Sequence, residues 1–187
     1  MSDPSEVLEF WRRIGPKGWF EVDPKVDAEI RNKFIGLWGE AWEGGLREWQ
    51  VIPDGMLAYL IVTDQFPRNM FRGDGRAFAT DDRARAAARR AVMSGLDLKI
   101  ADGERSFVYL PFEHAESIGD QDWAVDLIEH RILSASTLLH AKTHREVIRR
   151  FGRFPFRNAA LNRKSTTLEE AFLAAGGYGS ILQELAG

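Results

Sequence analysis

The sequence predicts an all-α fold in a single domain spanning residues 1–187. Apolar residues recur at the three- and four-residue spacing of a helix face along most of the chain. Residues that cap or break helices bound these segments, and none of them alternates like a strand. A chain of 187 residues with 44% hydrophobic residues also suits one domain with its own core.

The first clear helix is expected from Asp23 to Trp42. Asp23-Pro24 offers an N-cap followed by proline at the first helical position, and Gly44-Gly45 ends the helix. One face of this helix carries Val26, Ile30, Phe34, Leu37, Trp38 and Ala41. We therefore expect this face to be buried.

A second helix is expected from Pro53 to Phe66, with Leu57, Leu60 and Ile61 on one face. Pro67 should end it, because the proline ring clashes with the carbonyl four residues earlier and restricts the preceding residue.

A third helix should follow Thr80, with the threonine as its cap, and should end at Gly95. Its stripe of small residues suits close packing on a neighbour, and comprises Ala84, Ala87, Ala88, Ala91 and Val92.

The pattern is helical again from Asp120 to Phe151, as two helices or as one long helix, with the likeliest break at residues 134–137. Pro155 should begin a short helix. Thr166 and Glu169 form a capping box for a last helix that runs through Leu173.

Composition excludes several classes of protein. Without cysteine there is no disulfide, thiolate metal site or cysteine nucleophile. The net charge of −3 weighs against a general nucleic-acid binder. No signal peptide or membrane-spanning run is recognisable, so a cytoplasmic protein is expected, with no cofactor and no metal site. The chain nevertheless has 19 arginines and only 6 lysines.

Asp64, Gln65, Arg68, Asn69 and Arg72 form the first group of interest. Asp64 shares the apolar face of its helix, and a buried carboxylate needs a partner, which Arg68 or Arg72 can supply. Two interpretations are open: a buried ion pair that fixes the turn, or a ligand pocket that Arg68, Asn69 and Arg72 line.

Histidines form the second group. His114 and Glu116 can converge in a loop as an acid/base pair, or simply belong to a polar helix start. His140 and His144 share a helix face with Val147 and Ile148. Without a third ligand this pair favours part-buried, hydrogen-bonded histidines over a metal site.

The arginine excess is densest between Arg145 and Lys164, where seven basic residues and one acid give a net +6. Phe151, Phe154 and Phe156 are interleaved with them. Arginine forks match carboxylates and phosphates, so this segment is a candidate anion site. The alternative is internal pairing, because residues 113–129 hold six acids and no lysine or arginine.

Three long motifs resemble one family, the domain of unknown function numbered 924. They are Leu60-Ile61-x-x-Asp64-Gln65-Phe66-Pro67-Arg68-Asn69-x-Phe71-Arg72-Gly73, Tyr109-Leu110-Pro111-Phe112-x-His114-x-Glu116 and His144-x₃-Ile148-x-Arg150-Phe151-Gly152-Arg153-Phe154-Pro155-x-Arg157-Asn158. The resemblance covers about nine-tenths of the chain. It implies a tetratricopeptide-like α–α superhelix of about 8–10 helices, and no activity.

The chain departs from the family pattern at three positions. Phe156 stands where the family usually has histidine, and Ala115 where it has serine. If either family side chain is catalytic, this chain lacks it. Asn162 replaces a usual glycine, which suggests a turn residue that tolerates left-handed geometry.

Two functions from different classes follow. The first is a tetratricopeptide-like binding module for an anionic small molecule or peptide, with a site made of Asp64, Gln65, Arg68, Asn69, Arg72, Arg150, Arg153, Arg157 and Asn158. The alternative is a hydrolase-like enzyme for a small phosphorylated or carboxylated substrate, with His114, Glu116 and His144 as catalytic residues. Twelve phenylalanines and six tryptophans are more than one small core can bury, so an exposed aromatic patch and a homodimer are also among the expectations.

Overall fold

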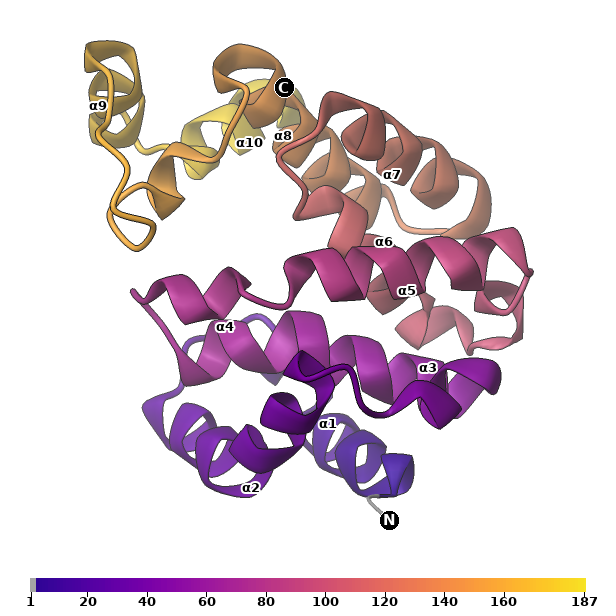
Figure 1. The fold of residues 1–187 in the computed structure, drawn as a ribbon. Helices are drawn as coiled ribbons and strands as arrows, with labels where there is room; N and C mark the ends of the chain where they lie inside the picture. The colour runs from indigo at the N-terminus through magenta and orange to yellow at the C-terminus, as the bar shows by residue number, and fades with distance from the viewer. Residues whose placement is uncertain (1–2) are drawn as a thin grey trace. The chain divides into compact units, whose positions relative to one another are not determined.

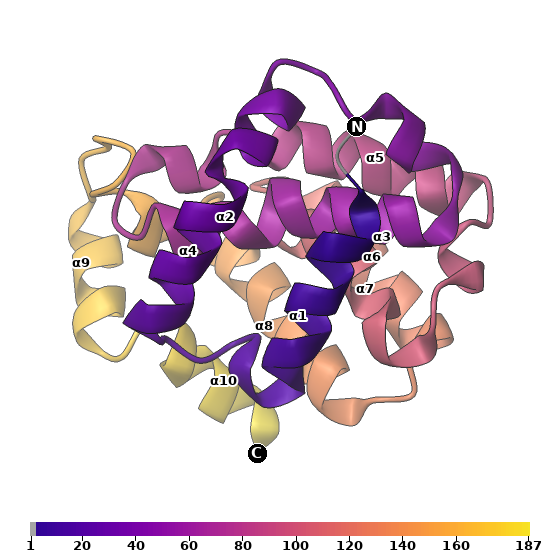
Figure 2. The same ribbon diagram turned by 90° about the horizontal axis from the view of Figure 1, so that it is seen from below.

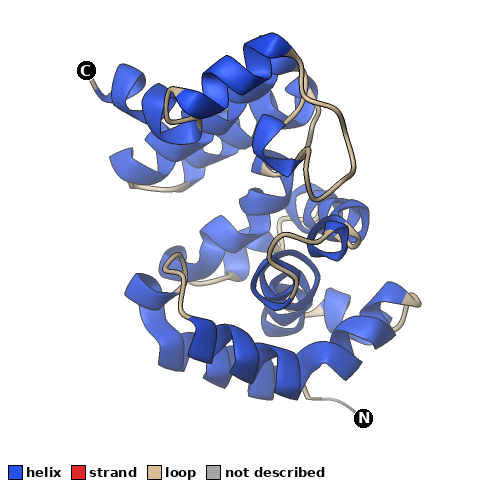
Figure 3. Ribbon diagram, turned by 90° about the vertical axis from the view of Figure 1, so that its left-hand side faces the viewer, coloured by secondary structure: helices blue, strands red, loops and turns tan. Residues whose placement is uncertain are grey.

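The computed structural model describes residues 3–187 and divides the chain into two compact units. Unit 1 ends at Val108 and unit 2 spans Tyr109–Gly187. Throughout residues 3–187 the regular structure is helical (Figure 3), which confirms the all-α prediction. The single domain and the tetratricopeptide-like array stay predictions.

Unit 1 follows the chain from indigo to magenta in Figure 1. Its elements are α1 (Pro4–Gly18), α2 (Pro24–Trp42), a 3₁₀ helix (Arg47–Val51), α3 (Pro53–Leu60), a π-helical segment (Ile61–Gln65), α4 (Phe66–Met70), a 3₁₀ helix (Gly75–Phe78), α5 (Asp81–Met93), a 3₁₀ helix (Asp97–Lys99) and the larger part of α6 (Asp102–Glu113).

Unit 2 begins inside α6. Its other elements are α7 (Ile118–Arg131), α8 (Ala135–Phe151), a 3₁₀ helix (Pro155–Arg157), α9 (Thr167–Ala174) and α10 (Tyr178–Ala186). Among residues 3–187 no helix is both long and apolar enough to cross a membrane.

Asp-Pro pairs start the first two helices of unit 1. The Asp3 carboxylate accepts the backbone N–H of Ser5, and the Asp23 carboxylate accepts that of Lys25 at 2.8 Å. Each satisfies a donor that the helix start leaves open. The predicted helix at α2 is therefore confirmed, whereas α1 and α6 were not expected from the periodicity.

The prediction that Pro67 ends the second helix is wrong. Helix α3 passes into the π-helical segment, where the N–H of Phe66 bonds the carbonyl five residues back, and α4 continues through Pro67. Pro67 lies in the first turn of α4, where its missing N–H is tolerated. The carbonyl of Thr63, four residues before Pro67, instead accepts the hydroxyl of Thr80 at 2.6 Å.

Thr80 precedes α5 as predicted, but its side chain does not cap that helix. The hydroxyl donates to Thr63 and accepts the indole N–H of Trp38 at 3.2 Å. Tertiary contacts thus outcompete the local cap. The predicted small-residue stripe of α5 is buried along its length, and Gly95 follows its end with a left-handed backbone.

Phe66 occupies the centre of the unit 1 core. Its ring lies 4.7 Å from that of Phe34, 6.0 Å from Phe10 and 5.8 Å from Trp11, measured between centroids. These rings come together because α1 packs against α3 and α2 packs against α4 (Figure 2). The π-helical segment and α4 therefore carry the residue on which the aromatic core converges.

Unit 2 is built on the pairing of α7 with α8 and of α8 with α10. Ser134 caps α8, so the helical pattern that begins at Asp120 is divided into two helices. The predicted capping box of Thr166 and Glu169 is present at α9. That helix is not the last, because α10 follows after Gly176 and Gly177, which both have positive φ.

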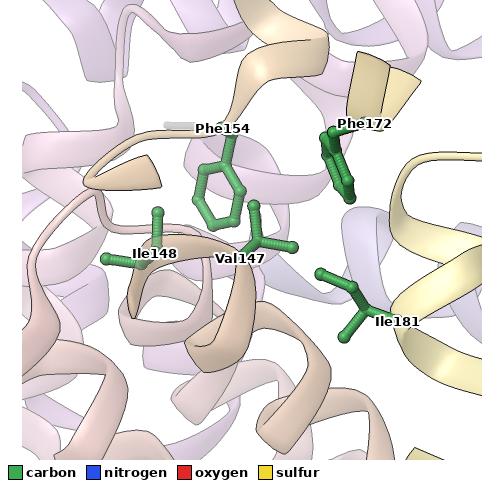
Figure 4. Close-up of a cluster of buried hydrophobic side chains, with 5 residues drawn as sticks. All are labelled: Val147, Ile148, Phe154, Phe172 and Ile181. Atoms are coloured by element: carbon green, nitrogen blue, oxygen red, sulfur yellow. The ribbon is translucent and has the colours of Figure 1, made fainter. Parts of the chain in front are cut away.

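A small apolar cluster closes the unit 2 core (Figure 4). Val147 of α8 lies among Phe154, Phe172 of α9 and Ile181 of α10, and all four are at most 9% exposed. The cluster fixes α8 and α10 against each other, and so positions the polar side chains that these helices carry next to it.

Candidate functional site

His144 of α8 faces a buried carboxylate at the end of α6. Its Nδ1 lies 3.3 Å from Oε2 of Glu113, whose side chain is only 2% exposed, while the His144 side chain is 17% exposed. The second oxygen of Glu113, Oε1, is buried and has no hydrogen-bond partner among the described residues. A buried carboxylate thus contacts an imidazole that still reaches solvent.

Backbone geometry fixes the same imidazole from a second side. The Nδ1 of His144 lies 3.0 Å from the carbonyl oxygen of His140, one turn earlier on α8. Both this carbonyl and the Glu113 carboxylate can only accept hydrogen bonds, so Nδ1 carries the proton. In the neutral ring the lone pair is then on Nε2.

Tyr178, the first residue of α10, joins the two histidines of α8. Its hydroxyl lies 2.7 Å from Nδ1 of His140 and 3.5 Å from Nδ1 of His144. Burial, with the charge of Glu113, raises the pKa of Tyr178 well above its usual range, so the phenol stays protonated. Burial and the nearby His144 lower the pKa of His140. The Tyr178 hydroxyl also donates to the carbonyl oxygen of His140 at 3.3 Å, so it contacts both the ring and the backbone of that residue.

His114 and Phe154 complete the surroundings of His144. The His114 and His144 rings are 5.9 Å apart in an edge-to-face arrangement, and Phe154 lies at 5.9 Å with its ring nearly perpendicular. Two predicted residues, His114 and His144, are thus brought together. Among residues 3–187, no group of three or more metal-ligating side chains is placed to hold a metal ion.

Glu116 does not take part in this cluster. Its carboxylate accepts two hydrogen bonds from Arg163, at 2.6 and 2.9 Å, and one from the backbone N–H of Phe154 at 2.8 Å. Burial by itself would raise the pKa of Glu116, but these donors outweigh it and lower the pKa. The carboxylate that contacts His144 is that of Glu113.

The predicted arginine site is extensively paired within unit 2. Arg153 forks onto Glu169 at 2.5 and 2.7 Å, and Arg150 reaches Glu146 at 2.6 Å and Glu184 at 2.7 Å. None of these three acids belongs to the acidic segment 113–129. That segment supplies partners to Arg145 and Arg163.

The remaining residues of that predicted site, Arg157 and Asn158, are buried. The Arg157 guanidinium lies over the Phe154 ring at 4.5 Å, and Asn158 donates to Ser165 at 3.1 Å. Phe156, which stands in place of the family's histidine, is 46% exposed. Asn162 has φ of +53°, which confirms the expected left-handed turn.

In unit 1, Arg68 is the partner that the buried Asp64 was expected to need. Its Nη1 lies 3.3 Å from Asp64 and 3.1 Å from Asp81, and Gln65 donates to Asp64 at 2.5 Å. Burial opposes the charge on Arg68, but the two carboxylates outweigh it and raise its pKa. These contacts fit the ion-pair interpretation of Asp64.

Asn69 and Arg72 bind a different acid, Asp27 of α2. Asn69 donates to Asp27 at 2.8 Å, and Arg72 forks onto it at 2.5 and 3.0 Å. Together they tie α4 to α2. This packing role accounts for the contacts of both side chains.

The sequence patterns do not single out Glu113 or Tyr178. Glu113 is one of six acids in the segment 113–129, and it lies one turn after Tyr109 on a helix whose apolar face is buried. Recognising α6 would have placed it on that face. Tyr178 stands between glycines, and no periodic pattern marks it.

Comparison with known proteins supplies a family. Residues 7–177 match the model of the family described as "Bacterial protein of unknown function (DUF924)". A solved structure, a protein of unknown function, ATU0120, from Agrobacterium tumefaciens, is 38% identical with a TM-score of 0.87, over 91% of this chain and 96% of that one. No curated protein matches the chain significantly. With its match spanning nearly all described helices, the chain belongs to the DUF924 family.

Proposed function

We propose that the protein is an enzyme in which His144 transfers a proton to or from a small substrate, with Glu113 as its positioning residue. The observation that carries the proposal is the 3.3 Å separation between Nδ1 of His144 and the buried carboxylate of Glu113. A carboxylate that holds one ring nitrogen of a histidine and leaves the other for substrate is a recurring arrangement in acid/base catalysis.

The contacts of Nδ1 support this role. The Glu113 carboxylate and the His140 carbonyl keep the proton on that nitrogen. Nε2 of the neutral ring is then the basic atom, and it becomes the acid once it has taken a proton. The buried Glu113 stabilises the imidazolium that forms during the transfer.

An arginine-lined binding module for an anionic ligand or peptide receives less support. Arg68, Arg72, Arg150 and Arg153 already contact carboxylates of the protein at 2.5–3.3 Å. A ligand would have to displace these internal partners, and Arg153 would leave Glu169 buried without its cation.

Substitution of His144 tests the enzyme. Asparagine keeps a donor near the position of Nδ1 and removes Nε2, so His144→Asn should retain the fold and lower turnover by about 100- to 10,000-fold. The protein is incubated with a metabolite extract from a bacterium, and consumed compounds are identified by mass spectrometry. A compound that the wild type consumes and His144→Asn does not is the expected result.

His130 provides the matched control. Its Nδ1 also contacts the carbonyl four residues back, at 2.8 Å, and a carboxylate, Asp126, at 3.3 Å, but Asp126 is exposed. His130→Asn should leave turnover unchanged. Turnover that persists in His144→Asn, or an extract that the wild type and His144→Asn leave identical, refutes the assignment.

A spectroscopic readout tests the positioning role of Glu113. The ¹⁵N shifts of His144 at high pH should report the Nδ1–H tautomer, and Glu113→Gln should shift that population because the amide can donate as well as accept. An Nε2–H tautomer in the wild type would contradict the arrangement, whatever the substrate.

A further inference from the structure

A second group of arginines, in unit 1, lacks the acidic partners that Arg68, Arg72, Arg150 and Arg153 have. Within the described chain, residues 3–187, no carboxylate forms an ion pair with Arg47, Arg83 or Arg90. All three side chains are exposed. Most other arginines of the described chain contact an acid, so the positive charge of this group is unusual in being uncompensated.

Arg47 and Arg83 meet at Gly44, which follows α2. Nη1 of Arg83 lies 3.4 Å, and Nη2 of Arg47 3.9 Å, from the point that a Cβ on Gly44 would occupy. Gly44 has φ of +91° and carries no side chain there. The carboxylate of Glu40 lies against the next residue, Gly45, but pairs with neither arginine. Two guanidinium groups thus share a site without a counter-ion.

Arg90 reaches the same region from the next turns of α5. It is seven residues after Arg83, so the two share a face of the helix. Its guanidinium donates to Oε1 of Gln50, which lies on the same 3₁₀ helix as Arg47 (Arg47–Val51). Arg90 is therefore held at the short helix that also carries Arg47.

Two of the three guanidinium groups are held in place before any ligand binds. Arg47 donates from Nε to the carbonyl oxygen of Gly44 at 3.1 Å, and Arg90 is held by Gln50. Both keep further N–H donors, since a guanidinium has five. Held donors lose less conformational entropy on binding, which favours a specific site over a diffuse charged surface.

We infer that Arg47, Arg83 and Arg90 form a binding site for a small soluble ligand that carries a phosphate group. A phosphate has three terminal oxygens and close to two negative charges, which suits two arginines that meet at Gly44 and a third held at the adjoining 3₁₀ helix. A carboxylate offers only two oxygens and one charge. The site is independent of His144 and holds whether or not the proposed enzyme is correct.

Inorganic phosphate is the probe that tests the site. The Nε–Hε signals of the arginines are followed by NMR as phosphate is added, with sodium chloride at matched ionic strength as the reference. Signals of Arg47, Arg83 and Arg90 should move along a saturable curve in phosphate only. Because a hydrogen bond to a charged group is strong, Arg83→Gln and Arg47→Gln should each weaken phosphate binding by about tenfold or more.

Arg76→Gln is the control, since Arg76 is exposed and paired with Asp74 at 2.8 Å. It removes the same charge and should leave the phosphate affinity within about twofold. Equal shifts in phosphate and chloride, or equal affinity in wild type and Arg83→Gln, overturn the site. Binding to phosphatidic acid vesicles that inorganic phosphate does not compete with overturns the assignment to a soluble ligand.

Discussion

The Thr80 hydroxyl donates to the carbonyl of Thr63, which Pro67 leaves without a helical N–H donor. Thr80→Val is therefore the most direct test of how the helix continues through Pro67. Valine keeps the size of the side chain and removes its hydroxyl. The carbonyl oxygen of Thr63 then loses its donor, which Pro67 cannot replace. The indole N–H of Trp38 loses its acceptor at the same time.

The cost follows from the burial of the three groups. Thr63 and Thr80 are at most 1% exposed and Trp38 is 8% exposed, so water cannot replace the lost partners. Each buried polar group left without a partner costs about 1–3 kcal/mol. The added methyl group returns about 1 kcal/mol at most. Thr80→Val should therefore lower the free energy of unfolding by about 1–5 kcal/mol.

Urea unfolding followed by tryptophan fluorescence measures this change in unit 1, which holds Trp11, Trp19, Trp38, Trp42 and Trp49 of the six tryptophans. The indole N–H of Trp38 should also exchange faster with solvent in the variant.

Thr80→Ser is the control, because it keeps the hydroxyl and should cost only about 1 kcal/mol for the lost methyl. Pro67→Ala supplies a backbone N–H, so Thr80→Val should cost less in that background than in the wild type. Equal costs for the valine and serine variants, or additive effects of Pro67→Ala and Thr80→Val, would refute the reasoning.

Two further predictions concern unit 2. Arg153 and the backbone N–H of Thr166 hold the pKa of Glu169 at about 2, below its ordinary value of 4.5. The ionised Glu169 therefore stabilises the fold fully above pH 4.5, and this contribution is lost as the pH falls toward 2. Glu169→Gln should therefore reduce the free energy of unfolding at neutral pH, and the difference from wild type should shrink below pH 4.5. Urea titrations that give the same difference at neutral pH and below pH 4.5 would contradict this. Asn162→Ala should cost about 1 kcal/mol because alanine is strained at φ of +53°, whereas Asn162→Gly should not destabilise; thermal unfolding that ranks the two the other way would contradict it.

Local signals in the sequence sufficed for the helices that carry their own caps. Asp23-Pro24, Ser134 and the pair Thr166 and Glu169 act within three residues, and each is found at the predicted helix start. The chain gave no comparable signal at Tyr178, where two glycines with positive φ precede α10. That helix depends on its packing against α8 instead.

Tertiary contacts decided the two places where local rules failed. Pro67 breaks a helix by default, but a π-helical segment before it and the Thr80 hydroxyl from another element let the helix continue. Thr80 would cap α5 by default, yet its hydroxyl is committed to Thr63 and Trp38. In both cases the hydrogen bond is made with a residue far away in the sequence and not with a neighbour in the same helix.

The sequence by itself determined the helical class, the family, the need of Asp64 for a cation and the presence of more arginine than solubility requires. Only the tertiary structure decided which charges meet. It pairs Arg153 with Glu169 across sixteen residues, brings Glu113 rather than Glu116 to His144, and leaves Arg47, Arg83 and Arg90 without an acid. The reason is physical: a charge selects its partner by distance in space, which spacing along the chain does not fix.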